Sequence, residues 1–365
     1  MNHPPGRAAP LLLSLVLAAA CSHDGPYDIG PSPTVGPYSQ AIPRQLTFYY
    51  LADRTPSVHG DQLVFSRQND GEPDLAYTPY GREQCIAFMP AEGGTIQHQL
   101  CPNHLLPPTD TLVDTWIEPA LSPDGKRIAF TWQRGYRISA LALVDAYLMV
   151  TPVNTPQDTT YIRHQVMWSQ PDTPNARLAQ IATHITWVDS TRVRYLATFE
   201  HIIKVKGGGA ERVTDTIYKP LALLELNLQT GVAALVPGGD STIAYTTAPD
   251  GALWLVKSSD SSALLHVDPT TGQVTPAGRF SMSVWDLANV GGKAAAVVGP
   301  YHDGHGLWYG VGEWIDSAGT THRFPAMPGP WHRLAAWRGN QLVAEIENSV
   351  KLFGAPPDLW LLEIP

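Results

Sequence analysis

The stretch "PALSPDGKRIAF", residues 119 to 130, joins a tight turn to the start of a strand. Ser122, Pro123, Asp124 and Gly125 suit a turn, because proline presets φ at the second position and glycine accepts a left-handed conformation at the end. The alternating apolar run that follows is typical of a half-buried strand. The stretch therefore predicts a hairpin between two antiparallel strands.

The same pattern, a short turn followed by a strand-like run, occurs six times along the chain. The turns are marked by Gly60, Gly125, Ser190, Gly251, Gly292 and Gly339. A second turn marker follows each of the first five, at Gly93, Asp145, Gly231, Gly272 and Gly319. Each repeat thus holds four strands, here named A to D. The shortest repeat is about 41 residues, close to the roughly 40 to 45 residues of a propeller blade.

This repeat predicts an all-β fold, a six-bladed β-propeller with four antiparallel strands per blade, over residues 44 to 365. The sixth repeat ends before its strand D, and residues 41 to 51 form an unassigned strand-like segment ahead of the first repeat. We expect this N-terminal strand to complete the last blade, which closes the ring and removes an unpaired edge.

Residues 1 to 20 have the composition of a signal peptide. Arg7 supplies a positive charge, and residues 11 to 20 form an apolar run too short to span a bilayer. The small residues before Cys21 resemble the lipobox of bacterial lipoproteins. The resemblance implies cleavage before Cys21 and acylation of that residue, whereas the alternative is an ordinary signal peptide with a chance cysteine. Residues 21 to 43 are rich in Pro, Gly and Ser, which predicts a flexible tether.

The lipobox resemblance also implies a location in the cell envelope. Ser22 follows the cysteine, which favours a lipid-anchored protein of the outer membrane that faces the periplasm. Contact with the membrane is expected through the lipid anchor only. The net charge of -9, without a basic run, argues against nucleic acid as a partner, since binding to phosphate needs clustered Lys and Arg.

Two stretches resemble the repeat of TolB-like β-propellers, which also occurs in tricorn-type and prolyl-oligopeptidase propellers. They are "EPALSPDGKRIAFTW", residues 118 to 132, and "FSRQNDGEPDLAY", residues 65 to 77. The resemblance covers residues 44 to 365. TolB itself carries an N-terminal α/β domain and no lipid anchor, whereas this chain has a tether and the features of an anchored protein.

Cys85 and Cys101 are equidistant from Gly93. If Gly93 centres the C-to-D hairpin of the first blade, the two thiols lie at facing positions, close enough for a disulfide. In an oxidising envelope we expect that bond, and free buried thiols are the alternative. The same register pairs two further sets of residues, Ile86 with Leu100 and Phe88 with His98.

The long connections indicate a binding face. In a propeller the A-to-B and C-to-D turns lie on one face, and the B-to-C and D-to-A connections lie on the other. The expected insertions all belong to the second set and cover residues 69 to 82, 102 to 115, 153 to 180, 202 to 217, 299 to 306 and 348 to 357. Insertions on one face of a repeat fold commonly form its binding surface, although loops also lengthen without function.

We therefore expect a non-catalytic scaffold that binds envelope proteins through this face. Trp168 lies in the longest insertion together with Arg163 and His164, where an exposed indole would anchor a protein or a sugar. Glu118, beside Pro119 on a predicted strand A, is a further candidate because it would point into the central channel. Its plainer interpretation is an ion pair with a neighbouring Arg or Lys.

Two alternatives to a protein scaffold remain open. One is an enzyme, a metal-dependent lyase or a glycan hydrolase, and "YHDGHG", residues 301 to 306, offers weak candidate metal ligands in His302, Asp303 and His305. No third ligand is fixed by spacing, so no catalytic residue, metal or cofactor is assigned. The other alternative is a glycan-binding module that uses Trp168. No Gly-x-Ser-x-Gly motif occurs, which excludes a complete prolyl-oligopeptidase-type peptidase.

Overall fold

The computed structural model is all-β over the residues that it describes. These are residues 43–47, 52–68, 84–101, 112–138, 141–154, 162–165, 176–177, 181–198, 200–206, 212–219, 221–302, 308–325, 327, 329–347 and 357–364. They form strands, turns and short connections. Within this part of the chain, no helix has the length and apolar character needed to cross a bilayer.

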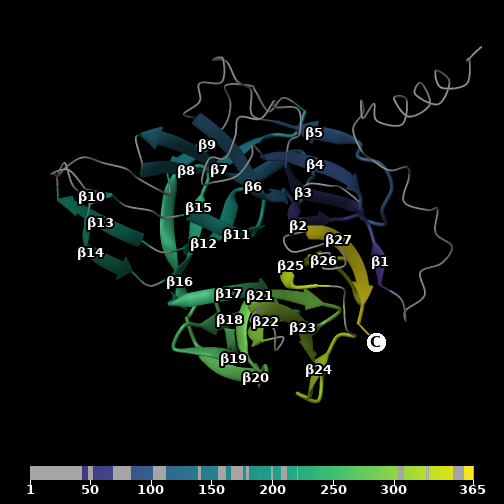
Figure 1. Cartoon of the computed structure of the whole chain (residues 1–365). Coiled ribbons are helices and arrows are strands. Elements are labelled where there is room, and N and C mark those ends of the chain that lie inside the picture. Colours follow the sequence, from purple (N-terminus) through teal and green to yellow (C-terminus); the bar gives the residue numbers. More distant parts are fainter. Residues whose placement is uncertain are drawn as a thin grey trace, which may run out of the picture.

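Four sheets each contain four antiparallel strands, which is the blade pattern of a β-propeller (Figure 1). The first comprises β11 (Ile181–Trp187), β12 (Arg192–Thr198), β15 (Ala222–Asn227) and β16 (Val232–Asp240). The second comprises β17 (Thr242–Thr247), β18 (Leu253–Lys257), β19 (Asp260–Val267) and β20 (Val274–Arg279). The third comprises β21 (Ser283–Val290), β22 (Lys293–His302), β23 (Trp308–Ile315) and β24 (Thr321–Arg323). The fourth comprises β25 (Trp331–Ala336), β26 (Gln341–Glu347), β27 (Pro357–Glu363) and β1 (Arg44–Gln45).

The first two predicted blades are not separate sheets. They form one eight-stranded sheet of β2 (Asp53–His59), β3 (Gln62–Gln68), β4 (Gln84–Pro90), β5 (His98–Leu100), β6 (Leu112–Leu121), β7 (Arg127–Ile138), β8 (Leu141–Pro152) and β9 (Ile162–Gln165). Strand β5 pairs with β4 only as far as Ile86. Gln84 is therefore open on that side, and it pairs in parallel with Thr115 of the long strand β6. The expectation of six separate blades is corrected to four separate sheets and one merged sheet.

A three-stranded sheet, which the repeat did not predict, lies beside these blades (Figure 1). It contains β10 (Ala176–Arg177), β13 (Glu200–Lys206) and β14 (Arg212–Lys219). Strands β13 and β14 form a hairpin in the connection between β12 and β15, and β10 belongs to the connection that precedes β11. The two longest predicted connections are thus joined by backbone pairing.

The expected turn at Asp145 is wrong. Asp145 lies inside β8, where it pairs with Arg134 of β7, and the pairing of these strands continues to Ile138 and Leu141. An isolated Asp without Gly or Pro fixes no turn geometry, and the apolar residues around it favour a strand. The predicted insertion at residues 153–180 is therefore divided, because it contains β9, which pairs with β8 as the fourth strand of this repeat.

The N-terminal strand closes the last blade, as expected. Arg44 and Gln45 of β1 pair with Leu361 and Trp360 of β27, so the beginning and the end of the propeller share one sheet (Figure 1). The next residue, Leu46, is 2% exposed and packs in one cluster with Leu359 and Leu361.

Replacing Leu46 by alanine is expected to lower the free energy of unfolding by about 2–4 kcal/mol, because the substitution leaves a cavity where the first and last strands meet. Urea denaturation measures the change. Val274→Ala is the matched control, since Val274 is 42% exposed, and it should cost less than about 1 kcal/mol. Equal stability of the Leu46 variant and the wild type would contradict closure by this segment.

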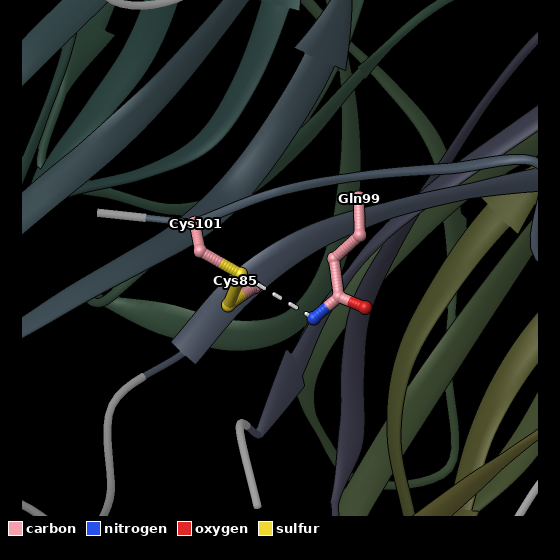
Figure 2. Close-up of a disulfide and its surroundings, with 3 residues drawn as sticks. All are labelled: Cys85, Gln99 and Cys101. Carbon is pink, nitrogen blue, oxygen red and sulfur yellow. Dashed lines mark hydrogen bonds between the residues drawn. A yellow bond between two sulfur atoms is a disulfide. The ribbon is translucent and has the colours of Figure 1, made fainter. Parts of the chain in front are cut away.

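The disulfide between Cys85 and Cys101 is present and joins two facing positions of the β4–β5 hairpin (Figure 2). The two α-carbons lie 4.4 Å apart. The side-chain amide of Gln99 donates a hydrogen bond to Cys101 Sγ at 3.5 Å. The companion register was also predicted correctly, because Ile86 pairs with Leu100 and Phe88 pairs with His98.

Candidate functional site

The first strand of each repeat, strand A, contributes to the wall of one central cavity of about 200 Å³. These strands are β2, β6, β11, β17, β21 and β25. Each of these strands contributes polar side chains or backbone to its wall. One residue from each strand is sufficient to define the site: Thr55, Glu118, His184, Tyr245, Asp286 and Arg333.

A shift in strand register positions these side chains. Each strand A shifts its register against its strand B once along its length. In the first three strands the residue at the shift takes a left-handed backbone conformation, with φ of 49° at Thr55, 56° at Glu118 and 54° at His184. Such bulges turn a side chain out of the alternating pattern, and they are common beside functional sites.

A chain of hydrogen bonds links the bulges from one strand to the next. The Thr55 amide donates to Glu345 Oε2 at 2.8 Å, and the Glu118 amide donates to Thr55 Oγ1 at 3.2 Å. The His184 amide donates to Glu118 Oε2 at 2.8 Å. The hydroxyl of Tyr245 donates to the His184 carbonyl at 2.6 Å. Backbone groups that the bulges free from pairing are thus bonded to the neighbouring strand, as buried polar groups require.

Four charged or ionisable side chains meet at the centre. Arg333 Nη2 lies 2.5 Å from Glu118 Oε1, and Arg333 Nη1 lies 3.9 Å from Asp286 Oδ1. His184 Nε2 lies 3.0 Å from Asp286 Oδ1, and the Leu334 amide donates to Asp286 Oδ2 at 2.6 Å. The side chains of Glu118 and Asp286 are only 8% and 4% exposed. The centre is therefore a buried network in which each carboxylate has a positive or hydrogen-bonding partner.

The geometry engages both ring nitrogens of His184. Nε2 lies 3.0 Å from Asp286 Oδ1 and also contacts Arg333 Nη1, and Nδ1 lies 3.0 Å from both Arg333 Nη1 and Thr183 Oγ1. A general base needs a free nitrogen that can reach a substrate proton. This arrangement holds the imidazole in place within the network and leaves neither nitrogen free for that task.

The network also shifts ionisation. Burial raises the pKa of Asp286, but His184, Arg333 and the Leu334 amide together outweigh it and hold that pKa below its ordinary value. Burial lowers the pKa of Arg333, and Glu118 and Asp286 more than reverse this effect. Burial raises the pKa of Glu345, which is 3% exposed.

These shifts predict opposite pH dependences for two carboxylates. Since the folded-state pKa of Asp286 is depressed, its stabilisation is present above the unfolded value of about 4 and is lost as the pH falls. Asp286→Asn should therefore lose stability less steeply than the wild type between about pH 5 and pH 3. The raised pKa of Glu345 works in the other direction, because it favours the folded state at low pH.

Glu345→Gln is the matched control for this pH series, and its stability relative to the wild type should rise between about pH 4 and pH 7. Urea denaturation at each pH measures both variants. Parallel curves for Asp286→Asn and the wild type would contradict the pairing of Asp286.

The structure places the predicted site residues in different parts of the fold. Glu118 faces Arg333 in the central network. Strand β9 pairs Arg163 with Met149 and His164 with Leu148, and β22 ends at His302, opposite Trp308. Cys21, Trp168, Asp303 and His305 lie outside the described residues. Among the residues that are described, no group of three His, Cys, Asp or Glu side chains is arranged to hold a metal ion.

Sequence reasoning missed His184, Asp286 and Arg333, although the repeat carries a signal for them. Each central residue lies five to seven positions before the turn marker of its own repeat, as Thr55 does before Gly60 and Arg333 before Gly339. Superposing the repeats on their turns would therefore have placed all six central residues within one residue of the sixth position before the turn.

Comparisons with known proteins assign no family to the chain. No protein-family model matches it, and no curated protein does. Virginiamycin B lyase from Staphylococcus aureus is similar with a TM-score of 0.44 at 12% identity, over 88% of this chain and 99% of that chain. A luciferin-regenerating enzyme has a TM-score of 0.45 at 11% identity, over 86% of this chain and 91% of the other. The PQQ-bound aldose sugar dehydrogenase of Streptomyces coelicolor has a TM-score of 0.41 at 11% identity, over 90% and 99%. We draw no activity from these likenesses.

Proposed function

We propose that this chain is a lipid-anchored envelope β-propeller that binds a protein partner, without catalysis, through the face of its B-to-C and D-to-A connections. The observation that carries the proposal is the sheet β10-β13-β14. It joins the D-to-A connection before β11 to the B-to-C connection after β12, and both leave the propeller on the same face. Backbone pairing between two insertions favours a built surface over loops that lengthened without function.

The proposal includes a closed ring of six blades of the TolB-like repeat, in which the eight-stranded sheet acts as two blades. Its halves, β2–β5 and β6–β9, are each antiparallel and are joined by one parallel pair. The strands A contact one another in ring order, from β25 to β2 to β6 to β11, and from β17 to β21 to β25. Tyr245 of β17 completes the circle through its bond to His184 of β11.

In this proposal the central network has a structural role. Its carboxylates are paired with Arg333 or hydrogen-bonded to His184 and to backbone amides, and these bonds connect strands from different sheets. Such a network costs desolvation but specifies how the sheets are arranged around the axis. The partner therefore contacts the connections and not the central cavity.

Lipidation of Cys21 and a tether over residues 21–43 are part of the same proposal. The tether would hold the propeller near the periplasmic surface of the outer membrane, within reach of a partner in the envelope. Palmitate labelling of the full-length chain tests this point, and Cys21→Ser should abolish the label.

Affinity purification of the tagged full-length chain from membranes tests partner binding. Replacing the β13–β14 hairpin, residues 200–219, with a two-residue Asn-Gly turn should remove a partner that the wild type retains. Ala318→Arg is the control, because Ala318 is exposed in the β23–β24 turn on the opposite face. Retention of every partner by the hairpin variant would overturn the proposal, and so would a stoichiometric divalent metal that is lost from His302→Ala/His305→Ala.

A further inference from the structure

A second cavity, of about 410 Å³, lies between two blades and away from the central network. Its walls come from β12, β15 and β16 on one side and from the turn between β19 and β20 on the other. The backbone closes one end, because a Cβ on Gly272 would lie 3.2 Å from the Gly238 nitrogen. Sites for small molecules commonly have volumes of about 300–1,000 Å³, so this cleft has the size of such a site.

Alternate residues of β16 face this cleft, as the pleat of a strand requires. Val232 pairs with Asn227 and Ala234 pairs with Glu225, and all four residues line the cavity. Val232 is 61% exposed, so the aliphatic part of this side is accessible to a ligand. The apolar lining is extended by two prolines, Pro237 and Pro269.

A nearly buried guanidinium with unused donors lies beside these aliphatic side chains. Arg194 lines the cleft and is 9% exposed, and its Nε donates to Glu225 Oε2 at 2.8 Å. Among the described residues, the two Nη atoms of Arg194 have no hydrogen-bond or ion-pair partner. Unused donors in a nearly buried site are unfavourable, and the planar fork of a guanidinium matches the two oxygens of a carboxylate. Arg194 therefore favours a carboxylate in the cleft.

The other charged groups that line the cleft already have partners. Arg192 donates through Nε to Asp189 Oδ2 at 2.7 Å and through Nη1 to Glu225 Oε1 at 3.0 Å. Arg192 and Arg194 are thus balanced by two carboxylates, which leaves no excess positive charge for a doubly charged phosphate. A singly charged carboxylate needs only the Nη atoms of Arg194. The small side chain of Ala234, next to Glu225 in the same row of paired residues, leaves space for it.

We propose that this cleft binds a small organic monocarboxylate with an apolar body. The carboxylate accepts hydrogen bonds from both Nη atoms of Arg194, and the apolar body contacts Val232 and Ala234. The cleft lies beside the C-to-D turns, since Val232 directly follows one such turn and Pro269 belongs to the next. These turns are on the face opposite the proposed docking surface, so the inference stands independently of the function proposed above.

Ligand-observed NMR titration of the full-length chain with hexanoate, hexanamide and inorganic phosphate tests the proposal. Hexanoate should bind about tenfold more tightly than hexanamide, which has the same body without the charge, and also more tightly than phosphate, which has no apolar body. Arg194→Gln should remove the difference between hexanoate and hexanamide. Arg279→Gln is the matched control, because the Arg279 side chain is 60% exposed outside the cleft, and it should preserve that difference.

Ala234→Leu tests the same site without touching an ion pair, so it keeps the test valid if Arg194→Gln does not fold. The larger side chain fills the space beside Arg194 and should weaken hexanoate about tenfold. Ala277→Leu is its matched control, because Ala277 is an exposed alanine of β20 outside the cleft, and it should change nothing. Equal binding of hexanoate and hexanamide, tighter binding of phosphate than of hexanoate, or no binding of hexanoate would overturn the proposal.

Discussion

Replacing Arg333 by alanine is expected to lower the free energy of unfolding by about 3–5 kcal/mol. The reason is that Glu118 and Asp286, whose side chains are 8% and 4% exposed, would keep their negative charges without the guanidinium between them. Urea denaturation at neutral pH measures the loss.

Arg338→Ala is the matched control for the Arg333 variant. The Arg338 side chain is 61% exposed and lies 3.6 Å from the exposed Asp61, so its removal should cost less than about 1 kcal/mol. Adding Glu118→Gln to Arg333→Ala should recover part of the loss, because the second change removes one buried charge. Similar stabilities of the Arg333 and Arg338 variants would show that the central network does not hold the blades together.

Removing the disulfide with Cys85→Ala and Cys101→Ala together is expected to cost about 3 kcal/mol. The two cysteines are 16 residues apart in sequence, and a cross-link over such a segment restricts the unfolded chain by about this amount. Urea denaturation with and without dithiothreitol measures the effect. The reductant should destabilise the wild type and leave the double variant unchanged. A wild type that is insensitive to reductant, or that contains two free thiols, would contradict the bond.

Local chemistry explains which parts of the fold could be predicted. Gly60, Gly125 and Gly251 all have positive φ at the A-to-B turns, so the turn motif and the strands beside it were visible in the sequence. The Cys85–Cys101 bond followed from a single symmetric hairpin. Asp145 misled because it resembled a turn residue without Gly or Pro beside it, and the pairing of β7 with β8 continued through it.

Long-range contacts explain what could not be predicted. The parallel pair of Gln84 with Thr115 depends on how far β5 extends, and no local pattern encodes that length. The pair of Glu118 with Arg333 joins residues 215 positions apart. Glu118 was expected to face an arginine or a lysine, but only the meeting of strands from different sheets at the central cavity shows that this partner is Arg333.

The central claim is that a partner protein binds the face that carries the B-to-C and D-to-A connections. Amine-reactive crosslinking of the full-length chain in its own membranes tests this claim most directly, and mass spectrometry identifies the linked peptides. Lys204, Lys206 and Lys219 belong to the β13–β14 hairpin, whereas Lys126 and Lys293 lie at A-to-B turns on the opposite face. Crosslinks to a partner protein are expected at the hairpin lysines. Partner crosslinks confined to Lys126 and Lys293 would contradict docking on the proposed face.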